Sequence, residues 1–156
     1  MSELYRKGAS LILTALLATS GASSSSAQTQ DKSEKAIIGT IVRFTSEATS
    51  VDVTIGADSP AVRDFLSMLP LTLTLEEHAG REKIGYLPRP LPLDGSPGSD
   101  PEDGDLIYFI PWGNLGFYYN AAGIGYSDQT LHIGSYEASL EQLEGLEGTV
   151  TIEIAP

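Results

Sequence analysis

The chain has 156 residues, of which 9 are basic and 21 are acidic, giving a formal net charge of −12 at pH 7. Such an acidic chain repels nucleic acid and anionic lipid, which bind through basic patches, so we predict neither as a partner. The sequence contains no cysteine, which excludes disulfides, thiolate nucleophiles and thiolate metal ligands.

The N-terminus is typical of an export signal. Arg6 and Lys7 precede an apolar run over residues 10–18, and small residues then lead to Ala22 and Ala27. The apolar run of about ten residues is shorter than the roughly twenty that span a bilayer, so a retained membrane anchor is the weaker alternative. We predict cleavage after Ala22 or Ala27, a periplasmic or secreted protein, and no membrane association after cleavage.

Removal of residues 1–27 as a signal peptide leaves enough chain for one domain with a hydrophobic core. Residues 28–35 are polar and lack periodicity, so we predict that they form a disordered lead-in. The single folded domain is assigned to residues 36–156.

This domain begins with a predicted hairpin and a helix. Residues 36–44 and 50–55 are β-prone and separated by a short turn. Ser59 can cap a helix whose first position is Pro60, and Pro70 ends the apolar helical pattern.

Two short strands and a long loop follow. Residues 71–75 alternate leucine and threonine, which predicts a strand with one apolar face, and residues 83–87 form the next strand. Glu77 and Lys83 flank the turn between them and are interpreted as a surface ion pair of little energetic value. Residues 88–105 contain five prolines; an ordered loop of this length in a small domain usually covers another part of the fold.

The acidic stretch 100–105 partly matches a calcium-binding loop. Gly104, however, lies one place before the position at which the EF-hand pattern requires glycine. A solvated acidic turn is therefore preferred over a loose calcium site. With only His78 and His132 and no cysteine, the sequence gives no zinc pattern, and we predict no metal and no cofactor.

The second half of the domain is richest in β-prone and aromatic residues. Its predicted elements are strands at 106–110 and 115–119 around a Pro-Trp-Gly-Asn corner, a strand at 130–134, a helix at 140–145 and a closing strand at 150–154. Many short strands with two short helices predict a mainly β fold, a closed or nearly closed barrel with helical plugs.

Several motifs, taken in order and spacing, resemble those of the cyclophilin-like domain family of small bacterial β-barrel proteins. They lie at residues 59–65 (SPAVRDF), 69–75 (LPLTLTL), 82–88 (EKIGYLP), 104–106 (GDL), 111–114 (PWGN) and 126–127 (YS). The resemblance implies a barrel of about eight strands with two helices, related in fold to the prolyl isomerases called cyclophilins. A shared fold does not carry the activity with it.

The resemblance also implies where an isomerase would carry its catalytic cation. Cyclophilin isomerases place an arginine on the strand after the first helix, whereas residues 71–75 contain neither arginine nor histidine. The protein is therefore predicted not to be an enzyme, and a prolyl isomerase that uses Arg63 or Arg89 instead is the first alternative.

The aromatic corner is the predicted ligand site. Trp112 lies between Pro111 and Gly113, where a ring need not be buried, and pleat alternation places Tyr108 and Phe109 on opposite faces. An apolar cleft with a few polar groups is typical of ligand sites. The predicted cleft for a peptide or small molecule is lined by Tyr86, Arg89, Tyr108, Trp112, Asn114 and Tyr118. The alternatives are a structural role for Trp112 and a structural or partner-docking role for the domain.

Overall fold

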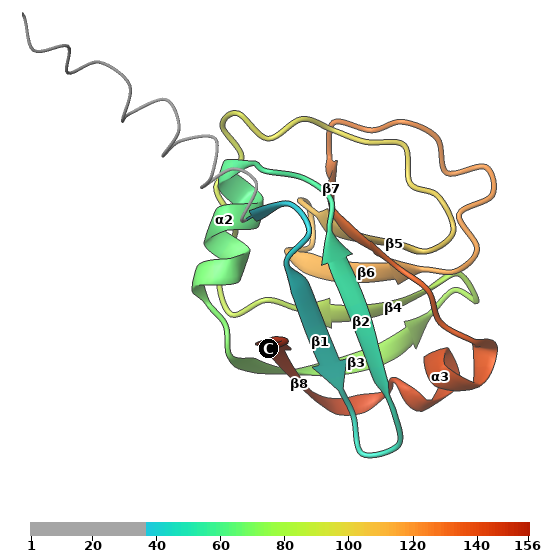
Figure 1. The fold of residues 1–156 in the computed structure, drawn as a ribbon. Coiled ribbons are helices and arrows are strands. Elements are labelled where there is room, and N and C mark those ends of the chain that lie inside the picture. Colours follow the sequence, from blue (N-terminus) through green and yellow to red (C-terminus); the bar gives the residue numbers. More distant parts are fainter. Residues whose placement is uncertain (1–36) are drawn as a thin grey trace, which may run out of the picture.

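Eight antiparallel strands close into a barrel in this computed structural model, which describes residues 37–156 (Figure 1). The order around the barrel is β1-β2-β7-β5-β6-β4-β3-β8. The strands are β1 Ile41–Thr45, β2 Ser50–Ile55, β3 Leu71–His78, β4 Glu82–Tyr86, β5 Asp105–Phe109, β6 Asn114–Tyr118, β7 Thr130–Tyr136 and β8 Gly148–Ile154; the helices are α2 Pro60–Ser67 and α3 Leu140–Gly145. This confirms the predicted fold class. The predicted signal peptide and lead-in lie outside the described residues.

The barrel interior is filled by alternate side chains from every strand, as pleating requires. Leu73 and Leu75 of β3 point inward, while the alternating Thr72 and Thr74 are exposed. Near the centre, Phe44 of β1 meets Phe117 of β6 edge-to-face, with ring centroids 4.7 Å apart. The interior is thus a packed core.

Each helix closes one end of the barrel, as Figure 1 shows. The Ser59 side chain accepts a hydrogen bond from the Val62 amide at 3.2 Å, and α2 buries Phe65 in the core. At the other end a capping box between Ser139 and Gln142 starts α3. The helix then buries Leu143 against the core.

The strand boundaries depart most from the sequence prediction in two places, the start of β1 and the end of β3. The first strand begins at Ile41 because the chain turns at Gly39, which has φ +89°. β3 continues to His78, since its polar end pairs with β4 across a tight turn. Residues 76–78, which extend β3, do not alternate between apolar and polar side chains, so the sequence did not indicate that they form a strand.

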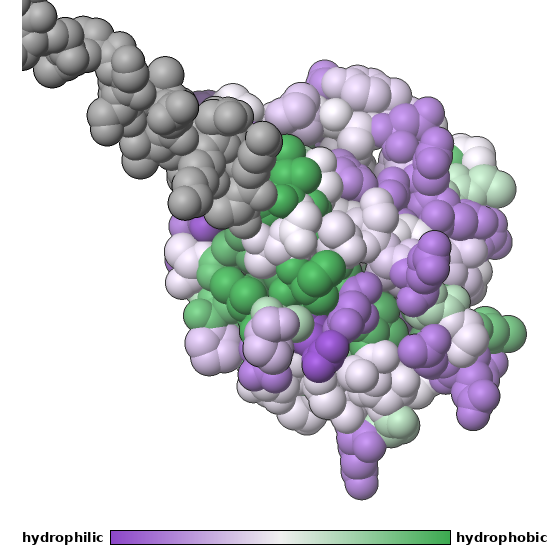
Figure 2. All heavy atoms as spheres, viewed as in Figure 1, coloured by the Kyte–Doolittle hydropathy of each residue, from purple (hydrophilic) through white to green (hydrophobic). Residues whose placement is uncertain are grey.

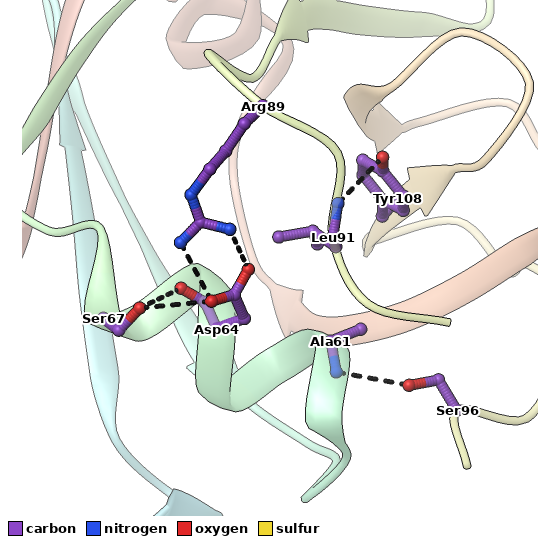
Figure 3. Close-up of polar contacts among 7 residues, drawn as sticks. All are labelled: Ala61, Asp64, Ser67, Arg89, Leu91, Ser96 and Tyr108. Carbon is purple, nitrogen blue, oxygen red and sulfur yellow. Dashed lines mark hydrogen bonds and ion pairs between the residues drawn. The ribbon is translucent and has the colours of Figure 1, made fainter. Parts of the chain in front are cut away.

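The long loop after β4 covers the α2 end of the barrel (Figure 3). Arg89 forms a two-pronged ion pair with Asp64 of α2, and the Ala61 amide donates to the Ser96 hydroxyl at 3.2 Å. The Leu91 amide donates to the Tyr108 hydroxyl at 3.3 Å. The loop is therefore fixed to both the helix and the barrel wall.

Candidate functional site

The outer wall formed by β5, β6, β4 and β3 carries the exposed aromatic residue of the corner. Trp112 is 50% exposed, yet its ring makes edge contacts with Phe109 of β5, at 5.5 Å, and with His78 of β3, at 5.3 Å. Strands β6 and β4 lie between β5 and β3. The indole therefore folds back from its corner and lies across the outside of these two middle strands.

A glycine makes room on this wall. Leu115 and Phe117 of β6 belong to the core, so Gly116 between them faces outward. A Cβ at Gly116 would overlap a carboxylate oxygen of Glu82 and would lie 3.3 Å from Ile107. The Glu82 carboxylate therefore occupies the space that a side chain at Gly116 would need. We call this group of residues the outer-wall cluster; its members are His78, Glu82, Phe109, Trp112, Gly116 and Tyr118.

Glu82 is a largely buried carboxylate whose oxygens keep some contact with solvent. The residue is only 9% exposed, and no other described residue donates it a hydrogen bond or forms an ion pair with it. Burial raises the pKa of this carboxyl; nearby His78 lowers it, and the charge of Glu77 raises it further. Across the strand, burial and then the charge of Glu82 raise the pKa of Tyr118.

A Glu82→Gln substitution is expected to stabilise the protein at neutral pH, because it removes the cost of burying a charge. When folding raises the pKa of a carboxyl, that carboxyl contributes most to stability at a pH where it is protonated in both the folded and the unfolded state. That contribution is lost as pH rises through the folded-state pKa. Thermal unfolding of both proteins between pH 3 and 7 should therefore show an advantage of the variant at pH 7 that vanishes below pH 4.5, the ordinary value for glutamate. Equal melting temperatures at pH 7 would contradict this expectation.

The structure brings only part of the predicted site together. Trp112 and the largely buried Tyr118 lie on the outer wall, and the exposed Tyr86 pairs in register with Asn114. Asn114 is buried; its amide nitrogen donates to the Leu115 carbonyl at 3.1 Å, and its Oδ1 has no partner.

The other two predicted residues face elsewhere. Tyr108 points into the barrel core, on the opposite side of the wall from Tyr118, so these two rings do not share a cleft. Arg89 is held on α2 by Asp64. Strand register separates Tyr108 from Tyr118, because Tyr108 pairs with Leu115 and so even positions of β5 share the inner face with odd positions of β6.

A cavity that was not predicted from the sequence lies between α3 and the end of the barrel that this helix covers. It has a volume of about 430 Å³ and is lined by Tyr119, Tyr136, Leu140 and Leu143 among others. The hydroxyl of Tyr119, one of the lining residues, donates a hydrogen bond to Glu77. Burial, followed by this hydrogen bond, raises the pKa of Tyr119 to about 12.

An acidic depression of about 600 Å³ adjoins this cavity and includes the stretch that partly matched a calcium loop. Asp103 accepts a hydrogen bond from the Ala121 amide at 2.6 Å, and Asp105 accepts one from the Glu102 amide at 2.9 Å. These carboxylates hold the backbone turn. Within residues 37–156, no group of three or more histidine or acidic side chains is placed to hold a metal ion.

The fold and wall geometry define a barrel of the cyclophilin type. The chain belongs to the cyclophilin-like family, whose model matches residues 44–155. Among solved structures it is similar to the solution structure of the hypothetical protein AF2241 from Archaeoglobus fulgidus, with 20% identity and a TM-score of 0.55 over 76% of this chain and 96% of that one. That likeness shows the fold alone. No curated protein matches the chain.

Proposed function

We propose that this protein is an exported, non-catalytic binding domain that takes a peptide segment or small molecule on its outer wall. The observation that carries the proposal is the position of Trp112, which is half exposed yet packed against His78 and Phe109 of the outer-wall cluster. Ligand sites combine aromatic side chains with a few polar groups.

The placement of the cations supports a non-catalytic role. Prolyl isomerisation is accelerated by a cation or strong donor aimed at the imide nitrogen. Each basic side chain within residues 37–156 has a partner: Arg43 pairs with Asp52, Arg63 with Asp58, Arg89 with Asp64, and Lys83 with Glu77 and Glu147, while Arg81 donates to the Ala122 carbonyl. The isomerase alternative would gain support from proline-peptide exchange catalysis that disappears in Arg63→Ala or Arg89→Ala.

Export is proposed from the N-terminal pattern of basic, apolar and small residues. No helix among residues 37–156 has the length and apolar character needed to cross a bilayer. Intact mass measurement of protein from separated cell fractions should find mature chains that begin at Ser23 or Gln28 outside the cytoplasm. Chains that retain Met1 in the cytoplasmic fraction would contradict export.

Trp112 is the chain's single tryptophan, so its fluorescence reports directly on the proposed surface. Capture of a ligand from a panel of short peptides should shift this emission and protect it from acrylamide quenching. Trp112→Ala should abolish binding, measured by calorimetry, and should cost little stability because the ring is half exposed. Loss of folding in Trp112→Ala would instead indicate a structural role for the corner.

The docking alternative would use a different surface. Figure 2 shows an apolar area beside α2 on the face that carries β1 and β2, and Ile38 and Ile154 are half exposed. A partner that binds there should bind wild type and Trp112→Ala equally well, which separates this alternative from the proposal.

A further inference from the structure

We infer that the outer-wall cluster binds an organic cation, the ammonium or guanidinium group of a lysine or arginine side chain in a bound peptide, with Glu82 as its counter-charge. This inference rests on the proposed function and specifies the chemistry of its ligand. Two observations support it: Glu82 has no partner among residues 37–156 at its position on β4, and the Trp112 ring lies across β4 and β6.

Glu82 differs from the other acidic residues near the barrel because it has no hydrogen-bond or ion-pair partner in the part of the chain that the structure describes. Asp52, Asp58 and Asp64 each pair with an arginine, Glu77 pairs with Lys83, and Asp103 and Asp105 accept backbone hydrogen bonds. Only Glu82 is more than nine-tenths buried, and no other described residue donates to it or pairs with it. A buried charge is stable when it is paired, so a cation from outside would complete this site.

The nearest cation in sequence cannot supply the charge. Lys83 follows Glu82 on β4, and pleat alternation turns it to the opposite face of the wall. Its amine is held by Glu77 at 2.9 Å and by Glu147 at 2.6 Å. Glu82 and Lys83 therefore place opposite charges on opposite faces of β4.

The surroundings of Glu82 also suit an organic cation better than a metal ion. His78 and Tyr118 are its register neighbours on β3 and β6, and the Trp112 ring lies across the strands that carry Glu82 and Gly116. Aromatic faces attract ammonium and guanidinium groups, with tryptophan the strongest. A metal ion would require further oxygen or nitrogen ligands, and no metal-binding cluster exists among the described residues.

The charge of the whole domain favours the same ligand. Residues 37–156 contain 5 basic and 18 acidic side chains, and such an excess raises the local concentration of cations around the molecule. This field is non-specific, so the test must separate it from pairing with Glu82.

The matched control is Glu76→Gln. Glu76 is an exposed residue of β3, paired in register with Ile84, and its substitution removes the same charge as Glu82→Gln. The probes are N-acetyl-arginine methylamide, its neutral citrulline analogue and butylguanidinium, each titrated against Trp112 fluorescence at low ionic strength. Melting temperatures of both variants confirm that they are folded.

We expect the arginine probe to bind wild type at least tenfold more tightly than the citrulline probe. Glu82→Gln should remove this preference, and Glu76→Gln should retain it. If the cation that pairs with Glu82 belongs to a peptide, the arginine probe should bind more tightly than butylguanidinium. Equal binding of these two probes would identify a free organic cation as the ligand.

Three outcomes would overturn the inference: equal binding of the arginine and citrulline probes, an unchanged preference in Glu82→Gln, or an equal loss in both variants, which would show only the general charge effect. The proposed function fails separately, if no member of the peptide panel perturbs Trp112. A neutral peptide that binds in a Trp112-dependent manner would preserve that function and exclude the cation.

Discussion

Truncation of Tyr108 to alanine is expected to lower the free energy of unfolding by about 3–5 kcal/mol, the range for large aromatic residues removed from a core. Tyr108 is only 1% exposed and belongs to the main hydrophobic cluster of the barrel. The substitution also removes the hydroxyl that accepts the Leu91 amide, and so releases one attachment of the long loop. Chemical denaturation monitored by circular dichroism would measure the loss.

Two further variants separate the contributions. Tyr108→Phe keeps the ring and removes only the hydrogen-bond acceptor, so it should cost about 1 kcal/mol. Tyr86→Ala removes an exposed ring of the same type from the outer wall and should cost little. If Tyr108→Ala were no more destabilising than Tyr86→Ala, the inward position of Tyr108 would be wrong.

The sequence predicted the barrel well because its elements are specified locally. Alternating leucine and threonine in β3 encodes an inward and an outward face over a few residues, and Ser59-Pro60 marks the start of α2 through its own backbone contacts. Such signals depend on residues close in the chain. Together with the ordered motifs, they were sufficient to indicate the fold.

The candidate site was predicted less well because it depends on strand register. Glu82, Gly116 and Trp112 come from β4, β6 and the corner before β6, and neither Glu82 nor Gly116 is distinctive alone. The sequence pointed to Trp112 through its unusual corner. It did not show that Gly116 and Glu82 meet beneath the ring, since a shift of one residue in pairing would turn either of them inward.

Strand register also explains why the sequence prediction underestimated the energetic value of an ion pair at the end of β3. The cross-turn pair between Glu77 and Lys83 exists, with a distance of 2.9 Å, but it is not the surface pair that was predicted. The Lys83 side chain is only 4% exposed because it faces the barrel interior, opposite Phe117 in β6. A second carboxylate, Glu147, completes its environment at 2.6 Å.

Lys83→Met is therefore expected to destabilise the protein by about 2–3 kcal/mol at neutral pH. Removal of one partner from a buried ion pair costs about 3–5 kcal/mol, and exposed pairs contribute about 1 kcal/mol or less. An intermediate loss is expected, because Lys83 is buried while Glu77 and Glu147 are 40% and 48% exposed. Arg43→Met is the matched control, since the Arg43–Asp52 pair is exposed on both sides and its loss should be much smaller.

The loss caused by Lys83→Met should also depend on pH with a definite sign. Burial acts to raise the pKa of Glu77, but hydrogen bonds from Tyr119 and Lys83 outweigh it and leave that pKa below its ordinary value of 4.5. A carboxyl with a lowered pKa stabilises the fold above its unfolded-state value, and this contribution disappears as pH falls through the folded-state value. The difference between wild type and variant should therefore be largest near pH 7 and shrink below pH 4.5. Denaturation curves that show the same difference at pH 3 and pH 7 would mean that Lys83 acts through packing of its alkyl chain rather than through its charge.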